Sequence, residues 1–174
     1  MQTPVIETER LLLRPLYQTD AEHIFKAWAS DPRVTEYMIY TTHQNVGTTR
    51  EWLKATEAKI DSDEQYDWGF LLKETGMLIG SGGAYYKAEQ DAFSIGYNFA
   101  FDYWHKGFCT EAMKAIIDFL HKKCGARHIV SDHAIGNPRS GEVMKKLGMV
   151  FDRDGEYTCF DGRVFKAKYY RMDF

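Results

Sequence analysis

The segment Tyr103-Trp104-His105-Lys106-Gly107-Phe108-Cys109-Thr110-Glu111-Ala112 joins a strand-like run to a helical pattern through a short turn that holds one glycine. The first backbone N–H groups of a helix have no acceptor inside the helix, and the helix dipole favours negative charge at that end. A glycine turn also lets the backbone come close to a bound anion. The segment therefore predicts a phosphate-binding site, and hence a ligand that carries phosphate.

The strand that leads into this turn is predicted by strict alternation over residues 92–101. One face holds Phe93, Ile95, Tyr97, Phe99 and Phe101, and the other holds Ala92, Ser94, Gly96, Asn98 and Ala100. Successive side chains of a strand point to opposite faces of its sheet. We therefore expect the bulky face to pack against helices and the small face to leave room for a ligand.

The remaining patterns place this strand and turn in the middle of the chain. The predicted order is strand, two helices, three strands, helix, strand, helix and two strands. Antiparallel hairpins come first, and a βαβ unit follows from residue 92 to residue 134. The sequence thus predicts an α/β chain of the α+β type, with a mixed, mostly antiparallel sheet of about seven strands and about four helices. We expect one domain over residues 1–174.

Composition narrows the partners and the compartment. The 174 residues carry a formal charge of −3, which gives no reason to expect nucleic acid or an anionic membrane as the main partner. The sequence has no apolar run of about 18 residues and no secretion signal, so we expect a cytoplasmic protein. Three widely spaced cysteines argue against a disulfide framework. We expect no metal site, because His121 and Cys124 have no second pair of ligands.

Taken together, the motifs resemble the GCN5-related N-acetyltransferases (GNAT), in particular the branch that includes the ribosomal-protein N-terminal acetyltransferases. The resemblance spans nearly the whole chain. It rests on four motifs in the family's order: Thr8-Glu9-Arg10-Leu11-Leu12-Leu13-Arg14, Ile95-Gly96-Tyr97 followed by the glycine turn, Asn137-Pro138-Arg139-Ser140, and Lys146-Leu147-Gly148-Met149. The resemblance implies the GNAT fold, with the βαβ unit as the acyl-CoA site, and acetyl-CoA as co-substrate.

The resemblance also assigns residues to the cofactor. Backbone groups of Tyr97, Asn98 and Phe99 would pair with the pantetheine arm as an added strand. The turn would bind the cofactor through Trp104, His105, Lys106, Gly107, Phe108, Cys109 and Thr110, with the N–H groups from His105 to Thr110 on the diphosphate. Asn137 would bind the pantetheine amide, cap its helix, or do both. Lys106 either adds charge or is simply solvated. Cys109 stands where the family usually has glycine or alanine, and is a small packing residue or a reactive thiol.

For catalysis, the resemblance implies direct attack of an amine on the thioester. Met144 occupies the place of the tyrosine that many members use as proton donor, so Ser140 is the nearest replacement. Asp132 is our candidate for the base, acting through water, because some relatives place a glutamate there. His133 is the rival, since histidine is the side chain that ordinarily exchanges protons near neutral pH. A solvated aspartate at the end of a strand is the alternative for Asp132.

The acceptor is left open by the sequence. Glu36, Tyr37 and Tyr40 lie between the first two predicted helices, where this branch often contacts its substrate. The acceptor would be a primary amine, either a protein N-terminus or a small molecule. Because Met144 cannot donate a proton, a non-catalytic acyl-CoA-binding or sensing module is the alternative function. Relatives are monomers or homodimers, and we expect one of these two states.

Overall fold

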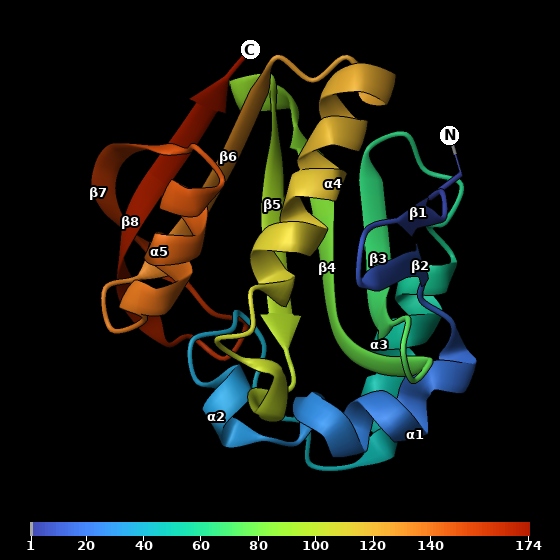
Figure 1. Cartoon of the computed structure of the whole chain (residues 1–174). Coiled ribbons are helices and arrows are strands. Elements are labelled where there is room, and N and C mark those ends of the chain that lie inside the picture. Colours follow the sequence, from blue (N-terminus) through green and yellow to red (C-terminus); the bar gives the residue numbers. More distant parts are fainter. Residues whose placement is uncertain (1) are drawn as a thin grey trace.

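A computed structural model describes residues 2–174, and its centre is a sheet of eight strands (Figure 1). The strands are β1 (Ile6–Glu7), β2 (Leu11–Pro15), β3 (Gln65–Leu72), β4 (Met77–Lys87), β5 (Ala92–Phe99), β6 (His128–Ala134), β7 (Val150–Thr158) and β8 (Val164–Asp173). Their order across the sheet is β1-β2-β3-β4-β5-β6-β8-β7. Every neighbouring pair is antiparallel except β5 and β6.

Within residues 2–174, five α-helices connect and cover these strands. They are α1 (Ala21–Ile24), α2 (Pro32–Thr35), α3 (Val46–Glu57), α4 (Phe108–Cys124) and α5 (Pro138–Lys146). The predicted fold class, with a mixed and mostly antiparallel sheet, is confirmed. The described residues hold one strand and one helix more than we predicted, because β1 has two residues and α2 has four, too short for a periodic pattern.

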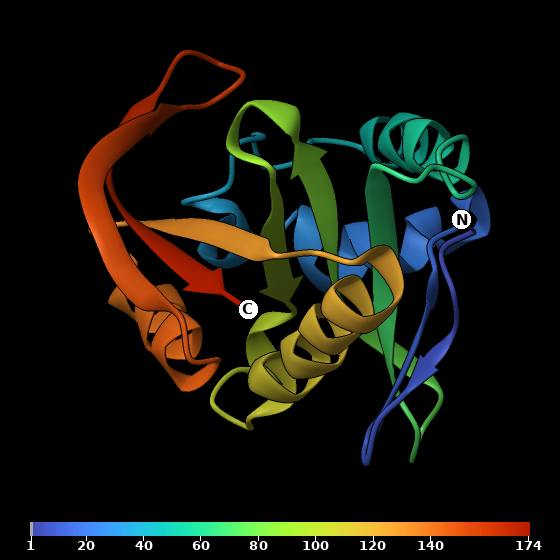
Figure 2. The ribbon, with the colours of Figure 1, turned by 90° about the horizontal axis from the view of Figure 1, so that it is seen from above.

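Helices α4 and α5 cover one side of the sheet, and α3 lies on the other side (Figure 2). The larger core lies between the sheet and α4. Its members are buried apolar side chains from both layers, among them Trp68, Phe70, Ile95, Phe99, Met113, Ile116 and Leu120. A second cluster packs Trp28 and Ile24 against Leu53 of α3. Phe93, Ile95 and Phe99 of the predicted bulky face belong to the larger core, as expected.

Strand β5 separates from β6 soon after the two strands meet. Their parallel pairing covers Phe93 with Ile129 and Ser94 with Val130. The Ser131 hydroxyl then donates to the Ile95 carbonyl at 2.9 Å. Beyond this point β6 pairs with β8, and within residues 2–174 the last four residues of β5 pair with β4 alone. The sheet therefore forks between β5 and β6, and residues 96–99 form one edge of the fork.

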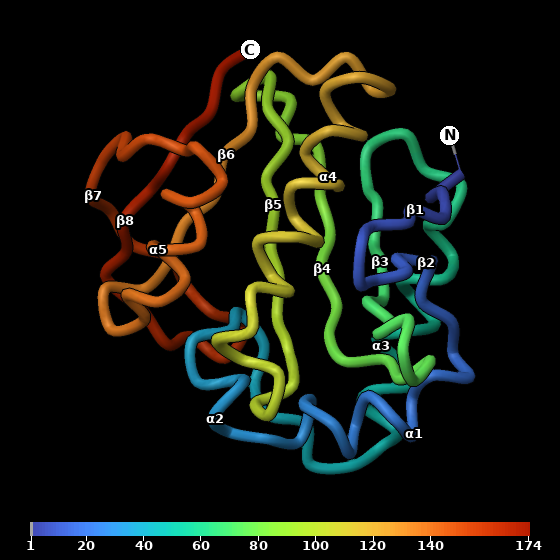
Figure 3. Tube along the Cα trace, viewed as in Figure 1, coloured from blue at the N-terminus to red at the C-terminus, as the bar shows by residue number. Residues whose placement is uncertain are grey.

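The end of β5 differs from the prediction. Alternation predicted a strand to residue 101, whereas the strand ends at Phe99 and a single 3-10 turn follows over Phe101–Tyr103. The indole N–H of Trp104 donates to the Phe99 carbonyl at 2.7 Å, which takes the place of a strand hydrogen bond. The chain then turns back and rises as α4 across the sheet (Figure 3). This places the predicted phosphate turn at the mouth of the fork.

Candidate functional site

The turn before α4 has the backbone conformation of an anion site. His105 has φ of 61° and Gly107 has φ of 79°, so two left-handed residues flank Lys106. Alternation between left- and right-handed conformations aims successive N–H groups into one concavity. Gly107 is the N-cap residue, and the first-turn N–H groups of Phe108, Cys109 and Thr110 have no acceptor within the helix. The turn therefore presents free backbone N–H groups at the start of α4, a geometry that suits an anion.

The N-terminal motif holds this turn in place. Glu111 accepts hydrogen bonds from the Thr8 hydroxyl at 2.6 Å and from the Arg10 backbone N–H at 2.7 Å. The Arg10 guanidinium pairs with the same carboxylate at 2.7 Å and donates to the Lys106 carbonyl at 3.0 Å. The sequence patterns assigned no role to these three side chains, although Thr8 and Arg10 stand in the first motif and Glu111 stands in the turn motif. The contacts explain why the first motif and the turn belong to one site.

Removing the Glu111 charge is expected to lower stability at neutral pH. Although burial raises the pKa of Glu111, the hydrogen bonds from Thr8 and Arg10 outweigh it and hold that pKa below its ordinary value. Such a carboxylate stabilises the fold fully above its unfolded pKa, near 4.5, and loses this contribution as the pH falls through its folded pKa. Glu111→Gln should therefore cost about 1 kcal/mol at pH 7, a fall in Tm of about 2–4 °C.

Thermal unfolding from pH 7 to pH 3 measures this difference. The gap in Tm between wild type and Glu111→Gln should be full at pH 7 and should shrink below about pH 4.5. Glu142→Gln is the matched control, because Glu142 forms an exposed pair with Lys145 on α5 and should change the Tm little. A gap that stays constant with pH would contradict the proposed role of the Glu111 charge.

The other residues of the turn have separate tasks. Phe108 is buried at the start of α4, with the Arg10 guanidinium 4.4 Å from its ring centroid. The Lys106 ammonium lies 5.2 Å from the Tyr103 ring centroid on an exposed surface. Burial raises the pKa of the Cys109 thiol, so this side chain is protonated at neutral pH. Cys109 therefore fits a small packing residue, and the reactive-thiol alternative loses support.

Helix α5 brings Asn137 and Ser140 to the fork. Asn137 is the N-cap residue of α5, yet its side chain makes no capping hydrogen bond, so capping does not account for the amide. The Tyr97 hydroxyl lies 3.0 Å from Ser140 Oγ and 3.0 Å from the Ser140 carbonyl oxygen. Met144 is 1% exposed and belongs to the core. Ser140, and not Met144, thus lies beside the edge strand of the fork.

Asp132 and His133 point to opposite faces of β6, as strand alternation requires. His133 is buried beneath α5, where its Nδ1 lies 2.8 Å from the Ala134 carbonyl and its Nε2 lies 2.5 Å from where a Cβ on Gly141 would be. Asp132 is half-buried, and burial raises the pKa of its carboxyl group. His133 is thus enclosed beneath α5, with an Nε2 that has no hydrogen-bond partner among the described residues, whereas Asp132 stays partly open to solvent.

Asp132 is paired with Tyr169 in the register of β6 and β8, and its charge acts on two further tyrosines. Burial raises the pKa of both Tyr97 and Tyr157, and the charge of Asp132 is a smaller cause in each case. Ser140 of α5 therefore contacts Tyr97 directly, whereas Asp132 lies on the face of β6 that points away from α5 and acts on Tyr97 through its charge.

The loop after α2 forms the opposite wall. Its backbone is held by Arg163, which donates to the Glu36 carbonyl at 3.0 Å and to the Tyr40 carbonyl at 3.4 Å. The Asn98 amide of β5 donates to the Tyr40 hydroxyl at 3.4 Å. The Tyr37 carbonyl accepts from the Tyr157 hydroxyl at 2.6 Å. The predicted acceptor loop is thus joined to β5 and to the β7–β8 hairpin.

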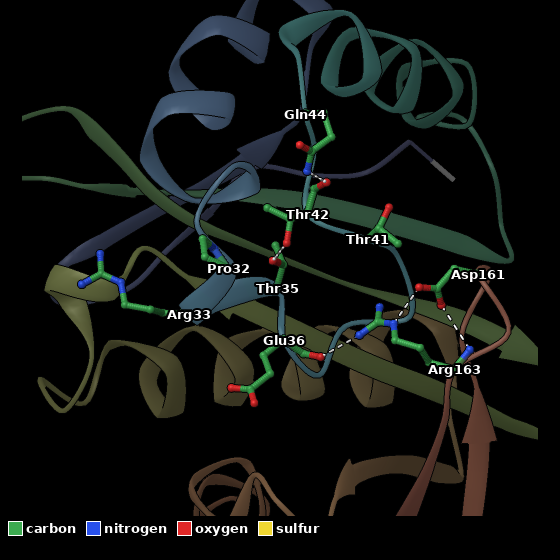
Figure 4. Close-up of a pocket in the computed structure, with 9 residues that line it drawn as sticks. All are labelled: Pro32, Arg33, Thr35, Glu36, Thr41, Thr42, Gln44, Asp161 and Arg163. Carbon is green, nitrogen blue, oxygen red and sulfur yellow. Dashed lines mark hydrogen bonds and ion pairs between the residues drawn. The ribbon is translucent and has the colours of Figure 1, made fainter.

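A cavity of about 540 Å³ is lined by this loop, α2 and the β7–β8 turn (Figure 4). Asp161 and Arg163 reach it from the β7–β8 turn, and the remaining lining comes from α2 and the loop after it. Glu36 lines this cavity, while Tyr40 contacts Asn98. Of the residues predicted for the acceptor, Glu36 therefore lies at this cavity and Tyr40 lies against β5.

Residues 2–174 contain no group of three or more His, Cys, Asp or Glu side chains placed to hold a metal ion. In the same range, no helix combines the length and the apolar character needed to cross a membrane.

Comparison with known proteins relates this geometry to a family. Residues 10–150 match the family model described as acetyltransferase (GNAT) domain. The chain is 33% identical over 161 residues to the uncharacterized N-acetyltransferase p20 of Bacillus licheniformis, which covers 90% of this chain and 89% of p20. It is 25% identical over 177 residues to the ribosomal protein uS5-alanine N-acetyltransferase of Escherichia coli (strain K12). This match covers 91% of this chain and 84% of the relative. The latter match supports the branch that the motifs predicted.

Solved structures share the fold. An acetyltransferase (GNAT family) from Bacillus anthracis has a TM-score of 0.83 at 22% identity over 98% of both chains. The microcin C7 self-immunity acetyltransferase MccE, solved in complex with acetyl-CoA and AMP, has a TM-score of 0.82 at 13% identity over 95% of this chain and 93% of MccE. The family model and the p20 match together span most of the chain, and the fork, the turn and α5 lie inside both. The chain therefore belongs to the acetyltransferase (GNAT) family.

Proposed function

We propose that the protein transfers an acetyl group from acetyl-CoA to a primary amine by direct attack, as one catalytic domain. The observation that carries this proposal is the fork between β5 and β6, which opens beside the left-handed turn and the N-terminus of α4. An extended chain that ends in a diphosphate matches both parts at once. The pantetheine arm would lie along residues 96–99, and the diphosphate would lie on the N–H groups of residues 105–110.

Two details of the fork support this placement. On the fork side of β5 the Ile95 and Phe99 carbonyls are already engaged by Ser131 and Trp104, so the arm would pair with the backbone groups of Tyr97 between them and with the Phe99 N–H. The Asn137 amide makes no capping bond and stands at the start of α5, where it can bind the pantetheine amide. MccE, which has the same fold, was solved with acetyl-CoA. Because its indole is bound to Phe99, Trp104 would affect ligand binding indirectly, by fixing the conformation of the loop.

Ser140 and Asp132 would carry out the two proton transfers of the reaction. The amine nitrogen attacks the thioester carbon, and the carbon–sulfur bond breaks with its electron pair on sulfur. Ser140 donates a proton to the departing thiolate. Asp132 removes the proton of the attacking amine through water, because an ionised carboxylate is the form that accepts a proton. The half-buried position of Asp132 favours this role, since its raised pKa makes it a stronger base than an exposed aspartate.

The acceptor would enter between the loop after α2 and the β7–β8 hairpin. Tyr37, Tyr40 and Tyr157 contribute aromatic and hydroxyl groups there, and Asp132 contributes negative charge. Such a wall suits a cationic amine. The relative from Escherichia coli is named for an alanine N-terminus of a ribosomal protein. We therefore place protein N-termini and small amines together as the acceptor class.

A panel of amines tests this function directly. Release of the CoA thiol is followed with acetyl-CoA and peptides with N-terminal alanine or serine, spermidine, or an aminoglycoside. Turnover with at least one acceptor, with the product acetylated at its amine by mass spectrometry, is the expected result. Absence of turnover across the panel, with intact acetyl-CoA binding, would favour the second candidate, a non-catalytic acyl-CoA sensor. The observation behind that candidate is Met144, which is buried where many members place a tyrosine donor.

A further inference from the structure

The Tyr97 hydroxyl makes a contact that the pairing of β5 does not require. It crosses from β5 to the first turn of α5 and lies 3.0 Å from both oxygens of Ser140, a residue 43 positions later in the chain. The Tyr97 ring packs against the larger core, which restricts the position of its hydroxyl group. The sequence pattern gave Tyr97 a role through its backbone alone. The contact between the Tyr97 hydroxyl and Ser140 therefore needs an explanation of its own.

Counting the hydrogens gives two arrangements of this pair. A phenol and a serine hydroxyl each have one hydrogen to donate. If Tyr97 donates to the Ser140 carbonyl, the Ser140 hydrogen is directed to the Tyr97 oxygen. If Tyr97 donates to Ser140 Oγ, the Ser140 hydrogen is released for another acceptor. The second arrangement leaves Ser140 able to donate to a sulfur atom in the fork.

We propose that Tyr97 is a positioning residue for Ser140, because its hydroxyl donates to Ser140 Oγ while Ser140 donates its hydrogen to the leaving thiolate. This inference rests on the proposed function. The carbon–sulfur bond breaks, sulfur keeps the electron pair and takes the Ser140 hydrogen, and the Tyr97 hydroxyl stabilises the negative charge that develops on Oγ. The proton released by the attacking amine restores Ser140 through water. No other reactant is needed.

The surroundings of Tyr97 suit a donor that keeps its proton. Burial is the main cause that raises the pKa of Tyr97, and the Asp132 carboxylate raises it further. The phenol is therefore neutral across the pH range in which the enzyme would work. Met144 has no hydrogen to donate, so Tyr97 supplies the phenol of this site from β5, acting through Ser140.

A double-mutant cycle tests this assignment. Tyr97→Phe, Ser140→Ala and the double variant are compared with wild type for kcat and for the KM of acetyl-CoA, using the best acceptor of the panel. A hydrogen bond to a developing charge is worth roughly 10- to 100-fold in rate, so Tyr97→Phe should lower kcat by that factor with little change in KM. The double variant should lose no more than Ser140→Ala alone, because Tyr97 acts through Ser140.

Tyr86→Phe is the matched control. Its hydroxyl bonds to Asp91 at the exposed end of β4, so kcat should stay at the wild-type level. An unchanged kcat in Tyr97→Phe, a change confined to KM, or fully additive losses in the double variant would each overturn the assignment. These outcomes differ from failure of the proposed function, which would leave the wild type itself without turnover.

Discussion

Asp132→Asn is expected to lower kcat by about 100-fold or more while leaving acetyl-CoA binding close to the wild-type level. General base catalysis by a positioned side chain contributes about 10²- to 10⁴-fold, and an asparagine amide cannot accept the amine proton. The carboxylate is half-buried on β6, on the face opposite His133. Steady-state release of the CoA thiol gives kcat, and the thermal shift with acetyl-CoA gives the binding.

The pH profile makes this prediction more specific. Asp132 must be ionised to accept a proton, and burial raises the pKa of its carboxyl group. As the pH falls through that raised pKa, the carboxylate is protonated and the rate should fall, at a higher pH than for an exposed aspartate. Asp132→Asn should lose this acidic limb together with the rate, because the group that titrates is gone.

Asp154→Asn is the matched control for this experiment. Asp154 is an exposed aspartate on the neighbouring hairpin, paired with Lys168 at 3.0 Å. It should retain both kcat and the acidic limb. If Asp132→Asn turned over at the wild-type rate, Asp132 would be removed from the mechanism, and a solvated strand-end aspartate would describe it better.

Local patterns predicted the fold and the cofactor side of the site because the relevant signals are close in sequence. The alternation over residues 92–101 and Gly107 before a helical stripe both act within a few residues of each other. The structure has a strand, a turn and a helix in these places. The predicted strand was two residues too long, because its end depends on the Trp104 indole and not on the period of the pattern.

The catalytic and acceptor sides could be predicted only as candidates, because their contacts join distant segments. Glu111 meets Thr8 and Arg10 about a hundred positions away, and Arg163 reaches the Glu36 carbonyl over 127 positions. No periodicity in one sequence records such pairs. Glu111 stands inside the turn motif. An acidic residue in the first helical turn of an anion site would repel the anion, so its presence was a sequence signal that a cation, here Arg10, lies nearby.

Gly107→Val is expected to weaken acetyl-CoA binding by at least about tenfold. Gly107 has φ of 79° at the N-cap of α4, a conformation in which a β-branched residue is a genuine outlier. A valine would push the turn toward a negative φ and redirect the N–H groups that face the diphosphate. Wild-type protein should gain about 2.7 kcal/mol of stability at a ligand concentration 100 times Kd. A tenfold rise in Kd reduces that gain by about 1.3 kcal/mol, which thermal shift titration resolves.

Gly76→Val separates loss of the site from backbone strain. Gly76 has φ of 69° in the β3–β4 turn, with no atom within 4 Å of an added Cβ, so valine there imposes similar strain away from the fork. Both variants should start from a lower Tm, yet Gly76→Val should keep the full acetyl-CoA shift. Titration with CoA is compared with titration with 3′,5′-ADP. CoA carries the diphosphate and the pantetheine arm, and 3′,5′-ADP carries neither, so the comparison isolates the binding that these two groups provide. If Gly107→Val bound CoA as tightly as Gly76→Val does, the diphosphate would not lie on this turn, and the pantetheine edge of β5 would have to supply the affinity.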